Sequence, residues 1–157
     1  MRFACGFDHG GYALRETVFA TLDTDGHVPV DLGAAVLDSG DDYPDFALAV
    51  VKAMLAGDAE RGILVCGSGV GASVAACKMV GIRAAICHDV YSAHQGVEHD
   101  DMNVLCLGSE VIGAELAVDL ARAFLGARFD GGERYVERLK KVAAMEKEMK
   151  HGHVTTA

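Results

Sequence analysis

A cysteine at the start of a glycine-rich turn is the most chemically informative feature of the sequence. Cys66 ends an apolar run and is followed by Gly67-Ser68-Gly69-Val70-Gly71. Glycines let the backbone turn tightly and approach a ligand closely, and the turn leads into a predicted helix whose first N–H groups favour negative charge. We expect a thiol there to ionise readily and to act as a base or nucleophile. The same N–H groups can hold the oxyanion of an enediolate, the intermediate of aldose–ketose isomerisation.

Two other interpretations of this turn stay open. Gly67-x-Gly69-x-x-Ala72 also fits the loose dinucleotide-binding fingerprint, with Asp89 after the next strand as a ribose-binding acid, although little chain remains for a substrate domain. Alternatively, the glycines only allow tight packing and Cys66 is an inert buried residue. We expect burial for the other cysteines, which are Cys5, Cys77, Cys87 and Cys106.

Among the histidines, His9 and His99 stand out because each lies next to acids, in Asp8-His9 and in Glu98-His99-Asp100. A carboxylate neighbour can orient an imidazole and keep its pKa near neutrality. The sequence shows no convincing zinc-ligand spacing, so we predict no metal. Arg134 and Arg138 are four residues apart and share one face of the last predicted helix, a pattern that also fits an ordinary solvated face.

Short apolar runs alternate with helix-period segments along the chain. The predicted strands are 2–7, 28–32, 62–66, 83–87 and 103–107, and the predicted helices are 12–22, 43–56, 70–80, 90–98, 113–125 and 135–149. Repeated strand–helix alternation predicts a three-layer α/β fold with a five-stranded parallel sheet. Because ligands bind at the carboxyl ends of such strands, the turns after the strands, at 8–11, 66–71, 88–89 and 108–110, should converge on one edge.

The bulk properties indicate one ordinary globular domain. The chain has 157 residues, of which we assign 1–150 to this domain and 151–157 to a disordered polar tail. The net charge of −9 argues against a nucleic-acid or anionic-membrane partner, because both require a basic face. No signal peptide or membrane-spanning apolar stretch is visible, so we expect a cytoplasmic protein.

Several ordered motifs together resemble one known family. They are Gly6-x-Asp8-His9-x-Gly11, Asp42-Tyr43-Pro44, Cys66-Gly67-Ser68-Gly69-Val70-Gly71, Gly81-Ile82-Arg83-Ala84, Tyr91-Ser92-Ala93 with His99, Asn103-Val104-Leu105 and Gly132-x-Arg134-x-x-x-Arg138. In these motifs the chain resembles the ribose-5-phosphate isomerase B family, which also holds the galactose-6-phosphate isomerase subunits. The resemblance runs from Arg2 to about Glu146.

This resemblance implies a Rossmann-like sandwich, a homodimer or homotetramer with an active site shared between subunits, and isomerisation of a sugar phosphate without metal or cofactor. It implies that Cys66 is the base, that His99 opens the sugar ring, and that Asp8 and Ser68 assist at the sugar hydroxyls. The remaining substrate-binding positions implied by the resemblance are His9, Tyr43, Gly67, Gly69, Val70, Gly71, Asp100, Arg134 and Arg138. Of these, His9 and the two arginines correspond to the phosphate-binding group.

Three positions depart from the family pattern. Asp100 replaces a common asparagine, Glu110 replaces a phosphate-binding arginine, and Tyr135 replaces a histidine. If Glu110 points into the site it weakens phosphate binding, whereas it is harmless if it neutralises Arg134 or faces solvent. The resemblance makes ribose 5-phosphate the expected substrate. The alternatives are another C4–C6 sugar or sugar phosphate, a partner-dependent paralogue, or a dinucleotide-binding module.

Overall fold

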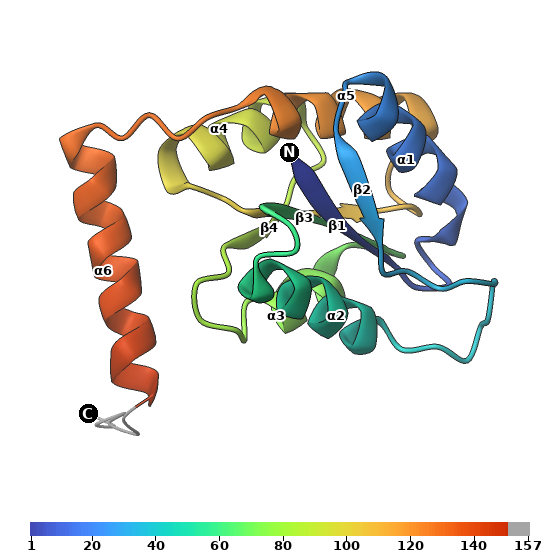
Figure 1. Ribbon diagram of the computed structural model, residues 1–157, viewed down its shortest axis with the longest axis horizontal. Coiled ribbons are helices and arrows are strands. Elements are labelled where there is room, and N and C mark those ends of the chain that lie inside the picture. The colour runs from blue at the N-terminus through green and yellow to red at the C-terminus, as the bar shows by residue number, and fades with distance from the viewer. Residues whose placement is uncertain (151–157) are drawn as a thin grey trace.

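Five parallel strands form the sheet of this protein, whose structure is a computed structural model that describes residues 1–150 (Figure 1). They are β1 (Arg2–Phe7), β2 (Val28–Asp31), β3 (Arg61–Cys66), β4 (Ala84–Ile86) and β5 (Val104–Gly108), in the spatial order β2-β1-β3-β5-β4. From β1 the chain first winds outward to β2, and then to β3 on the other side. The winding therefore reverses between β1 and β3, the place where open α/β sheets bind ligands.

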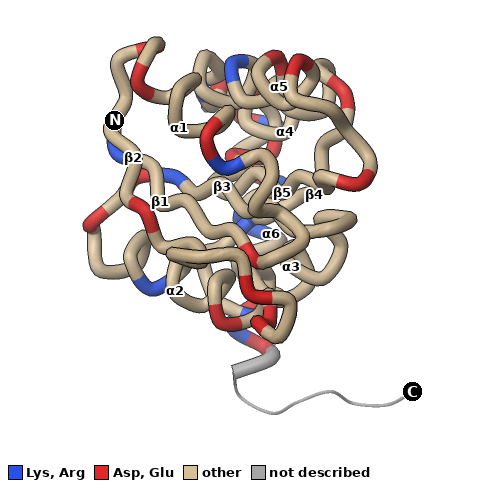
Figure 2. The backbone as a smooth tube through the Cα atoms, turned by 90° about the vertical axis from the view of Figure 1, so that its right-hand side faces the viewer, with Lys and Arg blue, Asp and Glu red and all other residues tan. Residues whose placement is uncertain are grey.

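Helices cover both faces of the sheet (Figures 1 and 2). They are the 3-10 turn η1 (Tyr12–Leu14) and helices α1 (Arg15–Thr24), α2 (Tyr43–Ala56), α3 (Val70–Ala76), α4 (Val90–Asp100), α5 (Ala114–Gly126) and α6 (Glu133–Lys150). Helices α1, α4 and α5 lie on one face and α2 and α3 on the other, while α6 stands beside the body near α4. The predicted three-layer α/β fold with a five-stranded parallel sheet is confirmed.

The central strands are buried on both faces, so their side chains alternate between two apolar layers. Phe7 and Leu107 pack under α1, α4 and α5, whereas Leu64, Cys66 and Cys106 pack under α2 and α3. Each fully buried large apolar side chain stabilises the fold by about 1.5–3 kcal/mol. Cys66 is the last residue of β3 and still belongs to this core, and the glycine turn begins directly after it.

The structure corrects three details of the sequence prediction. The helix predicted at 70–80 ends at Ala76, because Lys78 and Met79 donate to carbonyls three residues back, at 3.1 and 3.2 Å, in tighter turns. Cys77 lies at this end and is exposed, whereas burial was predicted. The strand predicted at 83–87 is the short edge strand β4, with intermediate and exposed residues. The predicted tail at 151–157 lies outside the described residues.

Two surface properties bear on partners. Among residues 1–150 no helix combines the length and apolar character required to cross a bilayer. In the view of Figure 2, the Lys and Arg positions along the backbone are interspersed with Asp and Glu positions. The absence of a nucleic-acid partner stays a prediction.

The turn after β1 tolerates no side chain at Gly11. A Cβ there would lie 2.0 Å from the Val65 carbonyl oxygen of β3. We expect Gly11→Ala to lower the free energy of unfolding by about 1–3 kcal/mol, the usual cost of overpacking. Gly126→Ala is the matched control, because nothing lies within 4 Å of that position. Urea denaturation measures both variants, and equal stability of the two would contradict this packing argument.

Candidate active site

Cys66 occupies the carboxyl end of β3, at the reversal point of the sheet. Its side chain is buried, with 6% exposed, and its Sγ accepts a hydrogen bond from the Gly69 N–H at 3.1 Å. Gly69 has φ +81°, a left-handed conformation that favours glycine, and it is the N-cap of α3. The turn thus aims a backbone donor at the sulfur atom and places that atom at the carboxyl end of the strand.

Two neighbouring turns hold the glycine turn in place. The Ser109 N–H donates to the Cys66 carbonyl and the Glu110 N–H donates to the Gly67 carbonyl, both at 3.0 Å. The Ser109 hydroxyl donates to the Gly10 carbonyl in the turn after β1. The turns after β1, β3 and β5 therefore form one connected surface, as the sequence predicted for the carboxyl edge.

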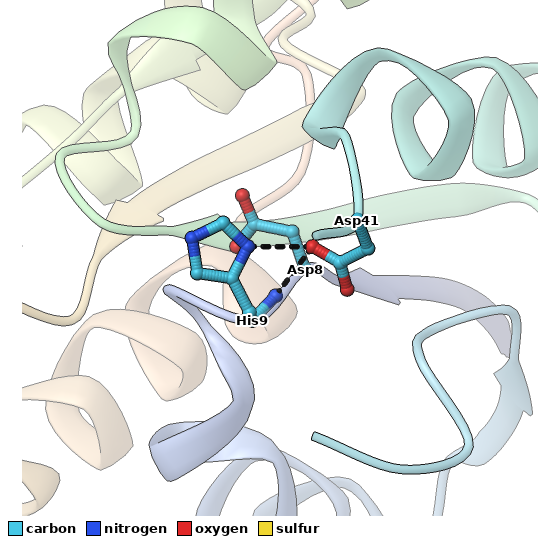
Figure 3. Close-up of side chains that lie close together, drawn as sticks. All are labelled: Asp8, His9 and Asp41. Atoms are coloured by element: carbon cyan, nitrogen blue, oxygen red, sulfur yellow. Dashed lines mark hydrogen bonds and ion pairs between the residues drawn. The ribbon is translucent and has the colours of Figure 1, made fainter. Parts of the chain in front are cut away.

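Asp8, His9 and Asp41 form a small polar cluster beside this surface (Figure 3). Asp8 is buried and accepts the Gly11 N–H at 2.8 Å; burial raises the pKa of its carboxyl group. The Asp41 carboxylate accepts the His9 N–H at 3.0 Å and bonds His9 Nδ1 at 2.6 Å. This bond raises the pKa of His9, because the nearby carboxylate stabilises the imidazolium, the form that can bind an anion.

These three residues could also be considered as metal ligands, because their side-chain ligand atoms all lie within 4.8 Å of one another. In this structure His9 and Asp41 bond each other, and that bond accounts for their proximity. Asp8 is occupied by a backbone N–H. The cluster therefore has an internal explanation as an ion pair, and the sequence prediction of no metal stays a prediction.

Tyr43 and Glu110 border the glycine turn at its two ends. The Tyr43 ring lies over Gly71, where a Cβ would come within 2.7 Å of the ring carbon Cζ. The Glu110 carboxylate lies against Gly67, with Oε1 3.4 Å from the position a Cβ would take. Glu110 makes no ion pair with a described residue. Its charge therefore remains at the rim of the turn and does not neutralise Arg134 of its own chain.

His99 and Asp100 lie away from this surface within one chain. Helix α4 begins just after the carboxyl end of β4 and runs back along the sheet, so its last residues reach the amino edge before β5 begins. His99 stacks on the Tyr135 ring of α6, with centroids 4.4 Å apart and an interplanar angle of 15°. A single chain therefore does not bring His99 to Cys66.

Arg134 and Arg138 also lie at the amino edge of the sheet, on the same side as His99. Both are exposed on α6, and neither makes an ion pair with a described residue. Arg138 and Asp100 line a groove of about 250 Å³ between α4 and α6, together with Arg83. The predicted site residues thus form two sets: Asp8, His9, Tyr43, Cys66, Ser68 and the turn glycines at one edge, and His99, Asp100, Arg134 and Arg138 at the other.

The comparison with protein families identifies the family of this chain and its class of activity. The model described as "Ribose/Galactose Isomerase" matches residues 3–142, nearly the whole chain. The chain belongs to the ribose/galactose isomerase family. The expected activity class, aldose–ketose isomerisation, is thereby confirmed.

Relatives of this isomerase cover it almost from end to end. Ribose-5-phosphate isomerase B of Escherichia coli is 41% identical and aligns over 92% of this chain and 96% of its own length. D-erythrulose-4-phosphate isomerase 2 of Mycolicibacterium smegmatis is 34% identical over 93% and 97%. The solved ribose-5-phosphate isomerase B of Clostridium thermocellum superimposes with a TM-score of 0.91 at 42% identity, covering 95% of this chain and 99% of its own.

Sequence reasoning missed two residues that shape the candidate site. Asp41 bonds His9 across 32 positions, and no local pattern predicts that contact, because Asp41 lies in the irregular segment between β2 and α2. His88 accepts the Gly108 N–H at Nε2, 3.0 Å away, and so fastens the end of β5 to the segment after β4. Its position directly after a strand was visible in the sequence, but its bonding partner was not.

The Asp41 contact predicts a shift in the titration of His9. Asp41→Asn should lower the pKa of His9, since the charged partner that favours the imidazolium is lost. The protonated form, present below the pKa, then disappears at lower pH than in the parent. The His9 Cε1–H signal in an NMR titration measures this. Asp42→Asn, at an exposed neighbouring position, is the control and should leave the midpoint unchanged; an unmoved midpoint in Asp41→Asn would contradict the assignment.

Proposed function

We propose that this sugar-phosphate isomerase interconverts ribose 5-phosphate and ribulose 5-phosphate through a cis-enediolate, with the Cys66 thiolate as base. The observation that carries the proposal is the Gly69 N–H bond to Cys66 Sγ on a glycine turn at the reversal point of the sheet. The names of relatives agree with it: one solved ribose-5-phosphate isomerase B, from Mycoplasma genitalium, holds ribulose 5-phosphate and superimposes with a TM-score of 0.87 at 38% identity.

In the proposed step the thiolate removes the proton from C2 of the open-chain aldose. The C2–H electron pair forms the C1–C2 double bond as the carbonyl electrons move onto O1. Backbone N–H groups between Gly67 and Gly71 stabilise this oxyanion, because they are fixed before the reaction begins. The thiol then returns its proton to C1, the O2–H proton passes to O1, and C2 becomes the carbonyl. Ser68 and Asp8 hold the sugar hydroxyls beside Cys66.

We further propose that the working site lies between two copies of the chain in a homodimer or homotetramer. Each copy has Cys66 and His9 at one edge and His99, Arg134 and Arg138 at the other. A two-fold interface that joins the first edge of one copy to the second edge of its partner creates two complete sites. In each site His99 opens the sugar ring, and His9 with the two arginines binds the phosphate.

Replacing the base tests the chemistry. Cys66→Ala should abolish turnover of ribose 5-phosphate, while the dissociation constant for the substrate and the unfolding midpoint change little, because the turn is held by backbone bonds. A coupled spectrophotometric assay and calorimetric titration measure these quantities. Cys77→Ala is the matched control, since Cys77 is exposed at the far end of α3. Substantial turnover by Cys66→Ala would refute the base assignment.

Mixing inactive variants tests the sharing of the site. Arg138→Ala should be nearly inactive at low substrate, yet a re-equilibrated mixture with Cys66→Ala should recover about a quarter of the parental activity, since hybrid dimers have one site free of both changes. A mixture of Cys66→Ala with Ser68→Ala is the control, because both changes lie in the same edge. No recovery in the first mixture would contradict a shared site.

A second candidate substrate is a shorter or less charged sugar. The carboxylate of Glu110, which lies against Gly67 without a cationic partner among the described residues, favours this candidate, because it repels a phosphate placed near the turn. The relatives include erythrulose-4-phosphate isomerases, so four-carbon sugar phosphates belong in any substrate panel.

Charge removal at Glu110 separates the two candidates. In water-like surroundings a unit charge 4 Å away contributes about 1 kcal/mol, so Glu110→Gln should lower the KM for ribose 5-phosphate by about fivefold. The KM for unphosphorylated ribose should not fall. Asp58→Asn, an exposed change between α2 and β3, is the control for net charge. An identical effect of both variants would remove Glu110 from the site.

A further inference from the structure

Two contacts fix the His99 ring in an orientation that the proposed function does not by itself explain. The side-chain nitrogen Nε2 of Gln95, one helical turn earlier on α4, lies 2.8 Å from His99 Nδ1. Tyr135 stacks on one ring face. On the other ring nitrogen, Nε2, the nearest charged atom is a Glu98 carboxylate oxygen at 3.7 Å. This distance exceeds that of a hydrogen bond, so Nε2 keeps its bonding capacity for a ligand.

The Gln95 contact bears on which nitrogen of His99 carries the proton. With the Gln95 amide nitrogen as the donor, His99 Nδ1 accepts and holds no hydrogen. A neutral imidazole with a bare Nδ1 has its proton on Nε2. The same Gln95 nitrogen lies 3.5 Å from a carboxylate oxygen of Asp100. Gln95 therefore orients two neighbouring side chains of the predicted site at once.

The Tyr135 stack determines the plane of the ring. A nearly parallel arrangement at 4.4 Å prevents the imidazole from rotating about its side chain without losing the contact. It also joins α6 to α4 at the point where the Asp130 N–H donates to the Glu98 carbonyl at 2.9 Å. The tautomer and the orientation of His99 are thus set by two different residues on two different helices.

We propose that Gln95 and Tyr135 are positioning residues that present His99 Nε2–H as a hydrogen-bond donor to the ring oxygen of a cyclic sugar phosphate. The inference rests on the proposed function and adds the two residues that make His99 competent for ring opening. In that step the C1–O4 bond breaks and its electron pair stays on O4, where the Nε2–H stabilises the developing charge. The O1–H electron pair forms the C1 carbonyl, and its proton passes through solvent to O4.

This assignment separates ring opening from the enediolate step. Cys66 and its turn act on an open chain, so disturbing the orientation of His99 should not affect substrates that are already open. Ribulose 5-phosphate and erythrose 4-phosphate are such substrates, because phosphorylation blocks the hydroxyl that would close a five-membered ring. A residue that merely stabilised the fold would instead reduce every activity in parallel.

The experiment compares ring-forming and open substrates in Gln95→Met and Tyr135→Leu. Each variant should lower kcat/KM for ribose 5-phosphate by about tenfold, the usual effect of one lost hydrogen bond or ring contact. Isomerisation of erythrose 4-phosphate and deuterium uptake at C1 of ribulose 5-phosphate in heavy water, followed by NMR, should stay within about twofold of the parent. Tyr135→Phe keeps the stacked ring and should restore parental turnover of ribose 5-phosphate.

His94→Ala is the matched control on the same helix, because His94 contacts Glu98 and makes no recorded contact with His99. His94→Ala should leave the ratio of ribose 5-phosphate turnover to open-chain substrate turnover unchanged. An equal loss on cyclic and open substrates in Gln95→Met, no loss on either, or the same split in His94→Ala would overturn the inference. If the parent protein acts on neither kind of substrate, the proposed function itself fails.

Discussion

The pairing of β3 with β5 is the constraint on which the rest of the site depends. Their register places Cys66 beside Gly108, and the ladder continues past the strands through the Ser109 and Glu110 N–H groups. The glycine turn is therefore held from its outer side by backbone bonds that need no particular side chain. Because the turn is fixed, the Gly69 N–H points at Cys66 Sγ at hydrogen-bond distance. A loose turn would leave the sulfur as one more buried thiol.

The other buried cysteines lie deeper in the core than Cys66. Burial raises the pKa of the Cys87 thiol to about 11, and burial also raises the pKa values of Cys5 and Cys106. These side chains lie among apolar neighbours, as the sequence predicted, and they stay protonated at neutral pH. Cys66 shares their burial but lies at the strand end, where N–H groups become available. Position on the strand, more than burial, therefore separates a candidate base from structural thiols.

The sequence predicted most of the fold because short apolar runs and helix-period segments alternate so regularly. It also predicted which turns meet at the carboxyl edge, since that follows from parallel strands alone. It did not predict the contact between His9 and Asp41, which depends on the path of an irregular segment. The separation of His99 from Cys66 could have been predicted from the sequence. His99 comes nine residues after Val90, and a helix of that length rises about 14 Å, which carries His99 away from the carboxyl edge. The stack on Tyr135 depends on how α6 packs and had no local signal.

The distribution of charge within one chain supports the proposal that two copies share a site. At the carboxyl edge, Asp8 and Asp41 lie beside His9, which Asp41 already engages, and the Glu110 carboxylate lies against Gly67. At the amino edge, Arg134 and Arg138 are exposed and make no ion pair with a described residue. A phosphate dianion near Cys66 would meet mostly repulsion from its own chain, and bringing the second edge of another copy across the first supplies the missing positive charge. Because each copy has both edges, such an arrangement closes on itself and leaves no arginine pair unused.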